Sequence, residues 1–327
     1  MKRVALLLLA AALILLAGCT PGFSAEATQE RTPVRLAMGY RPDIQFVPLY
    51  VAEELGYFDE AGFDVTFEHM PETEAAQLVG AGELPFAIVS GEQVLLAREQ
   101  GIPIVYVMTW WQEYPVGIAY ASESGIRTPA DLVGKRVGIP GLYGASYIGF
   151  EAIMQSAGID SALVELESIG YNQVEALYQG QEDAVVIYVN NEPVQLDALG
   201  LVVDVMRVSD YVHLMGNGLI ASEETIASSP MLIAGFVEAF SRGIQAVLDD
   251  PDQAYEIAQS YVEGLAEADE AVQRSILEES LTYWQTDSIG YSDPQAWINM
   301  QNVLLDIGYL QGAQDVSQAF TNLFTAP

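Results

Sequence analysis

The chain has 327 residues and a large excess of acidic side chains, with 45 Asp and Glu against 12 Lys and Arg and a formal net charge of −33. Binding to DNA or RNA depends on Lys and Arg that neutralise phosphates, so this charge argues against a nucleic-acid ligand. An anionic membrane surface is disfavoured for the same reason. Hydrophobic residues make up 51% of the chain, which excludes a disordered protein, and the length predicts about two domains.

The N-terminal segment has the pattern of a secretory signal. A basic start precedes an unbroken apolar run over residues 4–17, which ends before Gly18 and Cys19. This run is shorter than the roughly 20 residues that span a bilayer, although an ordinary signal peptide or a membrane anchor remains the alternative. The sequence Leu-Ala-Gly-Cys resembles the bacterial lipobox, which implies cleavage before Cys19 and a diacylglycerol on its sulfur. We therefore expect a signal peptide over residues 1–18 and a tether over residues 19–33.

Short apolar strands alternate with amphipathic helices in the first part of the chain. Several of the expected helices end at glycine, which commonly terminates a helix. Alternation of this kind favours a mostly parallel sheet that is covered by helices on both faces. The expected strands span residues 34–38, 63–67 and 86–89, and the expected helices span residues 47–55, 74–79 and 94–99.

A second set of the same units follows in the middle of the chain. Residues 78–89 and 176–187 are similar, and they align on Gly82 and Gly180. We interpret this as one α/β unit used twice, with chance similarity of a common helix-glycine-strand unit as the alternative. The expected strands of this set span residues 137–139, 164–168 and 184–188, and the expected helices span residues 147–157 and 173–178.

Two similar apolar strands, over residues 117–122 and 218–222, lie about 100 residues apart and are expected to cross between the two units. The chain after residue 222 reads as helical, with Pro230, Pro251 and Pro294 each in the first turn of a helix. We expect this helical tail to pack on the first unit. The predicted organisation is a first lobe over residues 34–121 plus 218–327 and a second lobe over residues 122–217.

Four motifs occur along the chain: YVAEELGYF at residues 50–58, GFDV at 62–65, GIP at 101–103 and TPADLVGKRVG at 128–138. Together they resemble the NMT1/THI5-like (SsuA/ThiY) group of ABC-importer solute-binding proteins, and most of all its riboflavin-binding RibY branch. The resemblance extends over residues 34–324. It implies an α/β, type II periplasmic-binding-protein fold, in which two α/β lobes are joined by two crossover strands with a ligand cleft between them.

A ligand of an open α/β sheet sits outside the carboxyl ends of the strands, so the turns after the strands are candidate binding segments. By the internal alignment, the second and fourth of the turns below are equivalent and should face each other across the cleft. The four turns span residues 40–46, 90–93, 140–147 and 188–193.

Aromatic side chains at or near these turns offer stacking surfaces to a flat heterocycle, and the neighbouring polar groups can pair with its edges. About half of the aromatic residues are expected to be core or rim residues. The candidate ligand-binding residues are Asp43, Gln45, Phe46, Ser90, Glu92, Gln93, Trp110, Trp111, Tyr114, Tyr143, Gly144, Ser146, Tyr188, Asn190, Asn191, Glu192 and Asn217, with Tyr40 and Tyr147 as further aromatics near the cleft.

Charge in the four turns bears on the ligand. In pyrimidine-precursor binders of the group, a glutamate in a similar turn binds the ring, and Glu192 resembles it; a solvated glutamate at a helix start is the alternative. Arg41 is the only basic residue in these turns, which argues against a sulfonate, nitrate or phosphate ligand. Backbone N–H groups near Tyr147 leave an anion possible, because a helix start can bind one.

The combined interpretation is a lipid-anchored binding protein, facing outside the cytoplasm, that delivers a neutral planar vitamin to an ABC permease and its ATPase. Riboflavin is the leading ligand, a thiamine pyrimidine precursor the first alternative and a sulfonate- or nitrate-like anion the second. We expect a monomer without cofactor or metal site. A structural or adhesive lipoprotein without a ligand is a third class.

An enzyme is disfavoured by the residues available for catalysis. The resemblance extends to a fungal pyrimidine synthase that consumes its own histidine and depends on a cysteine-containing motif. This chain has two histidines, His69 and His213, and its single cysteine is Cys19. Neither histidine has partners in sequence that indicate a general base, a nucleophile or a metal site.

Overall fold

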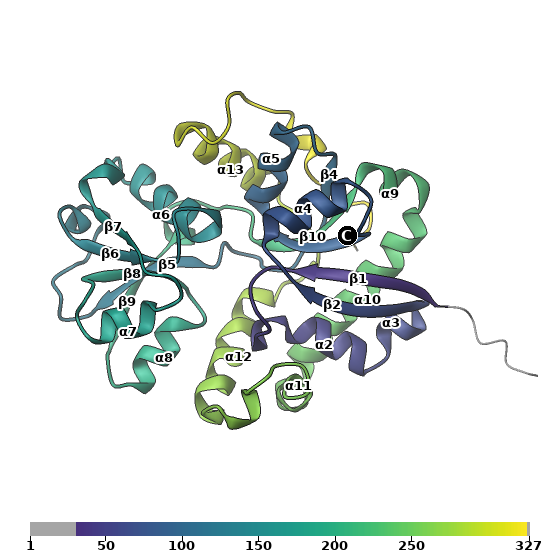
Figure 1. Cartoon of the computed structure of the whole chain (residues 1–327), viewed down its shortest axis with the longest axis horizontal. Helices are drawn as coiled ribbons and strands as arrows, with labels where there is room; N and C mark the ends of the chain where they lie inside the picture. The colour runs from purple at the N-terminus through teal and green to yellow at the C-terminus, as the bar shows by residue number, and fades with distance from the viewer. Residues whose placement is uncertain (1–30, 326–327) are drawn as a thin grey trace, which may run out of the picture. The chain divides into compact units, whose positions relative to one another are not determined.

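The computed structural model describes residues 31–325, so the predicted signal peptide, Cys19 and most of the tether lie outside the described residues. The described residues form two five-stranded sheets with helices packed around them (Figure 1). This arrangement confirms the predicted α/β class with two lobes. Both sheets belong to one compact unit that begins at Arg31.

The first sheet has the strand order β2-β1-β3-β10-β4. Strand β1 is parallel to β2 and β3, whereas β10 runs antiparallel to both β3 and β4. Leu36, Ala37 and Ile88 are at most 1% exposed, as expected for strands that are covered on both faces. The strands are β1 (Thr32–Met38), β2 (Phe63–His69), β3 (Phe86–Ser90), β4 (Ile104–Thr109) and β10 (Asn217–Ser222).

The second sheet repeats this plan, with the order β7-β6-β8-β5-β9. Strand β6 is parallel to β7 and β8, and β5 runs antiparallel to β8 and β9. In each sheet, therefore, the fourth strand arrives directly from the other lobe and runs against its neighbours. The strands are β5 (Val116–Ala121), β6 (Arg136–Ile139), β7 (Glu165–Ser168), β8 (Ala184–Tyr188) and β9 (Val203–Arg207).

Helices connect the strands and make up most of the chain after β10. Those predicted from the sequence are present, with shifts of a few residues at their ends. The helices are α2 (Val47–Glu54), α3 (Tyr57–Glu60), α4 (Glu72–Gly80), α5 (Gly91–Glu99), α6 (Gly144–Ser156), α7 (Gln173–Tyr178), α8 (Glu192–Ala198), α9 (Glu223–Ser228), α10 (Pro230–Asp249), α11 (Pro251–Ala258), α12 (Glu270–Trp284) and α13 (Pro294–Asp306), with the 3-10 turn η1 (Ile44–Phe46) before α2.

The internal similarity seen in the sequence corresponds to equivalent places in the two sheets. Gly82 follows α4 and precedes β3, and Gly180 follows α7 and precedes β8. Both glycines have positive φ, 74° and 67°, a conformation that glycine adopts without steric cost at a helix end. Strands β3 and β8 each take the third position in their sheet.

The lobe boundary differs from the predicted one. Strand β5 ends at Ala121 and was assigned to the first lobe, yet it pairs with β8 and β9 of the second sheet. The link between the sheets is therefore residues 110–115, and the boundary lies before Val116. Two similar apolar strands do not reveal from sequence which sheet each one joins, because their partners are distant in the chain.

The C-terminal helices begin as predicted at Pro230, Pro251 and Pro294. The side chains of Asp250 and Asp293 cap two of them by accepting backbone N–H groups. The tail does not pack on the first lobe alone. Helix α12 contacts both η1 and α8, and α13 contacts both α5 and α6, so these two helices bridge the lobes.

Helix α10 is the one described helix that is long and apolar enough to cross a membrane by length and composition. Its apolar face packs against α2 of the first lobe. Gly243 allows this contact, because a Cβ there would lie 2.2 Å from the carbonyl oxygen of Pro48. The packing is that of a core helix, which passes the same test of length and composition.

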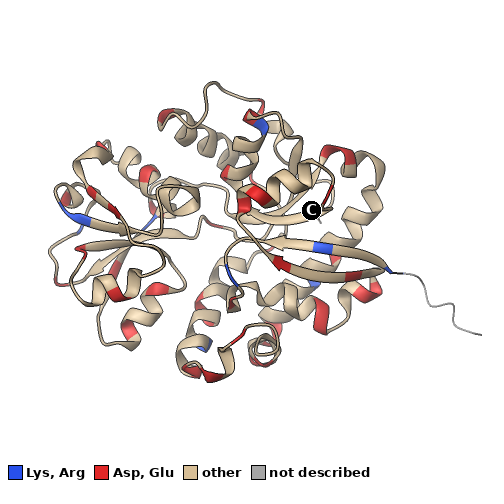
Figure 2. Cartoon of the chain, viewed as in Figure 1, with Lys and Arg blue, Asp and Glu red and all other residues tan. Residues whose placement is uncertain are grey.

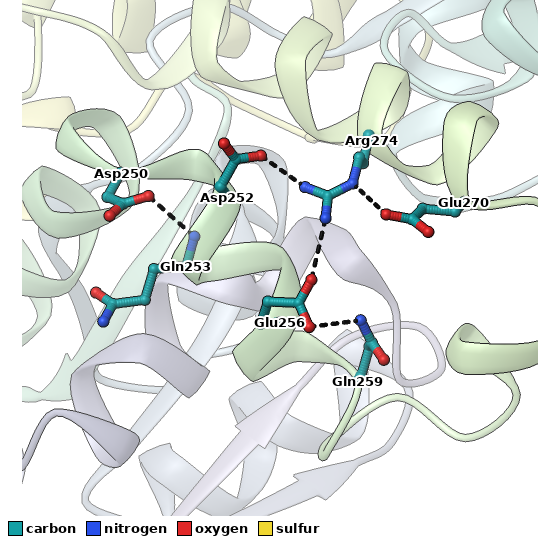
Figure 3. A network of polar contacts seen from close by, with 7 residues as sticks. All are labelled: Asp250, Asp252, Gln253, Glu256, Gln259, Glu270 and Arg274. Carbon is teal, nitrogen blue, oxygen red and sulfur yellow. Dashed lines mark hydrogen bonds and ion pairs between the residues drawn. The ribbon is translucent and has the colours of Figure 1, made fainter.

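Acidic residues are spread over the helices, and basic residues are few (Figure 2). The largest ion-pair cluster joins α11 to α12 around Arg274 (Figure 3). Its guanidinium contacts Asp252 at 2.8 Å, Glu256 at 3.0 Å and Glu270 at 2.7 Å. The same group lies 4.1 Å from the ring centre of Tyr255. The charge of one arginine thus partly compensates the charges of three carboxylates where α11 meets α12.

Candidate functional site

A cavity of about 650 Å³ lies between the two sheets, and residues from both sheets line it. Gly39 and Glu72 come from segments that follow β1 and β2 of the first sheet. Pro140, Tyr171 and Asn191 come from segments that follow β6, β7 and β8 of the second. These are the carboxyl ends of the strands, where the sequence predicts the cleft.

Most of the predicted site residues line this cavity. They belong to all four predicted turns, to the link over residues 110–115 and to the start of β10. The predicted residues in the lining are Gln45, Phe46, Gln93, Trp110, Trp111, Tyr143, Gly144, Ser146, Tyr188, Asn191, Glu192 and Asn217.

Five predicted residues lie outside the lining. Asp43 caps η1 by accepting the backbone N–H of Gln45 at 3.1 Å. Asn190 is fully buried and donates to Ser280 Oγ at 2.8 Å. The other three, Ser90, Glu92 and Tyr114, are hydrogen-bonded to one another behind the lining.

Buried aromatic rings form one wall of the cavity. Trp110 and Trp111 are each 2% exposed and follow β4 at the start of the link to the second sheet. The Phe46 ring lies 5.8 Å from that of Trp110, and the Tyr188 ring lies 6.5 Å from that of Trp111. Edge and tilted contacts of this kind hold the rings in place and leave a rigid apolar surface.

Two tyrosines from opposite lobes meet beside the cavity. Tyr40 follows β1, Tyr171 follows β7, and their ring centres are 5.1 Å apart at an interplanar angle of 78°. Tyr40 has φ of 66° and is the only non-glycine residue with positive φ in the described chain, so this position is strained. Tyr171 is 63% exposed, which places it at the outer edge of the cavity.

Sequence reasoning missed several lining residues that the strand-end rule could have found. Tyr171 follows the predicted strand over residues 164–168, and Glu72 follows the predicted strand over residues 63–67, but neither turn was included. Tyr40, which is predicted near the cleft, does line the cavity, and so do Arg41, Pro140, Gly141 and Ala145 of the predicted turns. The missed lining residues are Gly39, His69, Met70, Pro71, Glu72, Thr73, Ala76, Gln77, Ile88, Leu96, Ala97, Gln100, Ile102, Tyr171, Gln173 and Tyr309.

Helices α4 and α5 each present one face to the cavity. The lining residues of α4 include Thr73 and Gln77, and those of α5 include Gln93 together with Ala97, with Gln100 directly after the helix. Residues three or four positions apart share a face of a helix, so the α5 set extends over two turns. Thr73 Oγ1 donates to Gln93 Oε1 at 3.2 Å, which ties the two faces together.

Glu72 opens into the cavity from the start of α4. Its Oε2 accepts the backbone N–H of Ser90 at 3.0 Å, and its Oε1 accepts from Asn217 Nδ2 at 3.2 Å. Desolvation and the nearby charge of Glu92 raise the pKa of Glu72 to about 7. Gly39 makes room for it, because a Cβ at that position would lie 2.7 Å from Glu72 Cγ.

Glu192 begins α8 on the opposite side of the cavity, and its Oε2 accepts the backbone N–H of Tyr188 at 2.9 Å. Burial raises the pKa of this carboxyl to about 7. Burial also raises the pKa of Asp43 and lowers that of His69, whose ring lies against Phe46. In each case the environment favours the neutral form of the side chain.

The cavity lining contains little positive charge. Among the described residues that line the cavity, Arg41 is the only Lys or Arg, and it is exposed. Its guanidinium lies 5.2 Å from the ring centre of Tyr40. No group of three or more His, Cys, Asp or Glu within residues 31–325 could hold a metal ion. The arrangement suits binding of a flat polar molecule by stacking and hydrogen bonds.

Comparison with known proteins gives one family match, to a model described as NMT1/THI5 like, over residues 43–254. The riboflavin-binding protein RibY of Chloroflexus aurantiacus is 36% identical, covering 93% of this chain and 88% of the relative. The formylaminopyrimidine-binding protein of Halalkalibacterium halodurans is 30% identical, covering 79% and 78%. A protein of Legionella pneumophila named 4-amino-5-hydroxymethyl-2-methylpyrimidine phosphate synthase is 25% identical, covering 90% and 92%.

Among solved structures, the periplasmic aliphatic sulphonate binding protein SsuA of Escherichia coli aligns with a TM-score of 0.72. The alignment covers 88% of this chain and 96% of that protein at 14% identity. At this level of identity the match establishes the fold, which is the periplasmic-binding-protein fold expected from the sequence.

Proposed function

The chain belongs to the NMT1/THI5-like family, and from this premise we propose that it is the solute-binding component of an ABC importer with riboflavin as its ligand. It acts outside the cytoplasm, held to the membrane by lipid on Cys19, and delivers the vitamin to a permease driven by an ATPase. The observation that carries the proposal is the cavity, whose aromatic wall lies beside uncharged and acidic polar groups.

The ring system of riboflavin matches the aromatic wall. Three fused rings offer a large flat face, and Trp111, Phe46 and Tyr188 line the cavity from both lobes. A cavity of about 650 Å³ is within the usual range of about 300–1,000 Å³ for small-ligand sites. Each aromatic contact contributes about 0.5–1.5 kcal/mol beyond the area it buries.

The ribityl chain matches the faces of α4 and α5. Thr73, Gln77, Gln93 and Gln100 place hydroxyl and amide groups along about two helical turns of the lining. Such groups donate and accept hydrogen bonds, as the hydroxyls of a sugar alcohol require. A pyrimidine without a polyol chain would leave this strip without a partner, which favours riboflavin over the smaller ligand.

The charge of the cavity opposes an anionic ligand. Glu72 and Glu192 both line it, and Arg41 at the edge is the only Lys or Arg among the described lining residues. A sulfonate, a nitrate or a flavin phosphate would bring a negative charge that, among the described lining residues, only Arg41 could compensate. We therefore expect riboflavin to bind more tightly than its phosphate ester.

A thiamine pyrimidine precursor is the second candidate, and the carboxyl groups favour it. An aminopyrimidine presents a ring nitrogen beside an amino group, and a carboxyl such as that of Glu192 can pair with both. The relative from Halalkalibacterium halodurans is named for such a ligand.

We propose a binding protein and not a synthase. The relatives with 36% and 30% identity are named as binding proteins, whereas the relative named as a synthase is 25% identical. His69 lines the cavity, but its Nδ1 contacts the backbone oxygen of Tyr40 at 3.1 Å and has no acid or hydroxyl partner in the described structure. His213 lies outside the lining beside Asp293.

Titration of the purified chain with riboflavin, followed by flavin fluorescence, tests the ligand. Quenching at micromolar protein is expected, with weaker binding of the phosphate ester. An aminopyrimidine that stabilises the chain against heat, with no flavin quenching, would support the second candidate. No response to either compound contradicts the proposed ligand class.

A matched pair of variants tests the place of binding. Tyr171→Ala removes an exposed ring that lines the cavity and is expected to weaken riboflavin binding about fivefold to tenfold. Tyr178→Ala removes an exposed ring at the other end of α7, outside the lining, and should leave affinity unchanged. Equal effects of the two substitutions would place the ligand elsewhere.

A further inference from the structure

Ser90 lies between two carboxyl groups and cannot satisfy both with its own proton. Its Oγ is within hydrogen-bond distance of Glu72 Oε2 and lies 2.6 Å from Glu92 Oε1. A hydroxyl donates one proton, so one of these contacts requires a proton on the carboxyl, which then donates to Ser90 Oγ. The geometry therefore calls for one proton on the Glu72–Glu92 pair in addition to the hydroxyl proton of Ser90.

Neither carboxyl has a cation beside it. Glu72 and Glu92 take part in none of the ion pairs found among residues 31–325. Glu92 is fully buried and its Oε2 accepts from Tyr114 OH at 3.1 Å. Two like charges so close, without a counter-ion, favour retention of a proton on one of them.

The titratable groups that face this pair from other elements are all tyrosines. Tyr114 precedes β5, Tyr106 lies on β4 and Tyr188 ends β8. Desolvation by burial, together with the charge of the two carboxyl groups, raises the pKa of all three phenols. Desolvation, with a smaller contribution from the charge of Glu72, also raises the pKa of Tyr171, which follows β7. These phenols stay neutral around neutral pH, so the pair itself is where a proton is gained or lost.

Asn217 connects the pair to the cavity. Its Nδ2 donates to Glu72 Oε1, and the amide also lies within hydrogen-bond reach of the Tyr188 phenol, while its Oδ1 is buried and accepts none of the hydrogen bonds found among residues 31–325. The residue is 8% exposed and lines the cavity. Oδ1 itself has almost no exposed surface, so a ligand donor reaches it only when the Asn217 amide turns toward the cavity. Leaving such an acceptor unpaired costs about 1–3 kcal/mol, which a ligand that pairs with it would remove.

We propose that Asn217 Oδ1 and Glu72 form a paired acceptor that selects a ring N–H of the ligand, and that the proton shared with Glu92 through Ser90 sets the charge of this acceptor. The inference rests on the proposed flavin ligand for the identity of the donor. The oxidised flavin ring has one N–H, at N3 between two carbonyl groups. A ligand without this hydrogen leaves the acceptor pair unsatisfied.

The chosen probes are lumiflavin, in which the N3 hydrogen is the only hydrogen-bond donor, and N3-methyllumiflavin, which has none. Lumiflavin is expected to bind the unmodified full chain at least about tenfold more tightly than the methylated compound. The ratio of the affinities for lumiflavin and N3-methyllumiflavin should decrease as the pH falls below about 7, because protonation removes the charge of Glu72. Equal affinities at high pH would overturn the proposal.

Variants identify the residues responsible. Glu72→Gln is expected to abolish most of the preference for lumiflavin, whereas Glu74→Gln, an exposed change on the same helix, should preserve it. Glu92→Gln supplies an amide donor to Ser90 and removes the neighbouring charge, so the pH at which the preference is lost should fall. An unchanged pH midpoint in Glu92→Gln would overturn the role of the shared proton.

A ligand-free measurement separates this inference from the proposed function. Infrared spectra of the full chain at neutral pH should show a protonated-carboxyl band that weakens in the double variant Glu72→Gln/Glu92→Gln, with Glu74→Gln as control. Unchanged band intensity in the double variant overturns the shared proton. Failure of both flavins to bind, with the band weakened as expected, overturns the flavin ligand and its N–H selection but supports the shared proton.

Discussion

Acidic side chains gather at two places in the described structure, and the two clusters are stabilised in different ways. At the corner of α11 and α12, Asp252, Glu256 and Glu270 surround Arg274 at 2.7–3.0 Å. Their side chains are 64% to 92% exposed, so water and the arginine both compensate their charge. Exposed pairs of this kind contribute little to stability, about 0–1 kcal/mol each.

In the cavity, the carboxyl groups are paired with neutral donors. Glu72 and Glu192 accept backbone N–H groups, and Glu92 accepts from a phenol. Desolvation raises the pKa of all three, so burial favours the neutral forms of these carboxyl groups. The acidic side chains therefore occur in two settings: an exposed surface where an arginine and water compensate their charge, and a buried cavity where the neutral carboxyl form is favoured.

The largest expected effect is a dependence of stability on pH that originates in the cavity. The pKa of Glu192 is raised from 4.5 to about 7 in the folded chain. Its contribution to stability is therefore fully present below the unfolded pKa and is lost as the pH rises through about 7, by up to about 3 kcal/mol. Glu192→Gln should flatten the dependence of the unfolding free energy on pH between these values, as measured by denaturant unfolding.

The control for this measurement is Glu263→Gln, which changes an exposed acid and should leave the pH dependence as it is. A pH dependence that is equally steep in Glu192→Gln and in the unmodified chain would show that Glu192 keeps its ordinary pKa.

A cation placed at the edge of the cavity should compensate negative charge there, as Arg274 does in the surface cluster. Tyr171→Lys puts an ammonium group at an exposed lining position. The affinity for flavin phosphate relative to riboflavin should then rise about fivefold at low salt, about 1 kcal/mol. Fluorescence titration measures the ratio, and Tyr178→Lys, outside the lining, serves as control. A ratio that rises equally in both variants would mean that the cavity charge does not select the ligand.

The smallest effect is expected at the surface cluster. Arg274→Gln removes the cation shared by three exposed carboxylates and should lower the unfolding free energy by at most about 1 kcal/mol. High salt should reduce the difference further, because exposed charges are screened. Denaturant unfolding at low and high salt measures both. A loss of several kcal/mol that persists at high salt would contradict the assignment of this cluster to a solvated surface.

Local patterns explain how much of the fold could be predicted. Apolar strands such as residues 86–89, and helices that start at Pro251 and Pro294, carry their signals within a few residues. The partner of β5 could not be predicted in this way, because the pairing with β8 joins residues about 70 positions apart. The same applies to α12 and α13, whose contacts with both lobes depend on the completed fold.

In the candidate site, too, some residues could be predicted from local sequence and others could not, because their positions depend on the complete fold. Gln93 and Glu192 were predicted because they lie in the turns after two buried strands, β3 and β8. Glu72 lies equally close to the end of β2, but its turn is not among the four predicted ones, and its role depends on the space left by Gly39, a contact between different segments. Glu92 was predicted as a ligand contact, but it lies behind the lining, because the direction of a side chain at a helix start follows from packing.

The position of β10 has a consequence for how the chain reaches its folded state. Strand β4 is joined to the first sheet through β10, and the chain completes the strands of the second sheet before β10 begins at Asn217. An N-terminal fragment that ends before residue 217 thus lacks the strand that links β4 to β3. The order of synthesis therefore links the two lobes. The second sheet begins with β5, which follows β4 of the first sheet along the chain. The first sheet is complete only when β10 has been synthesised, after all strands of the second sheet.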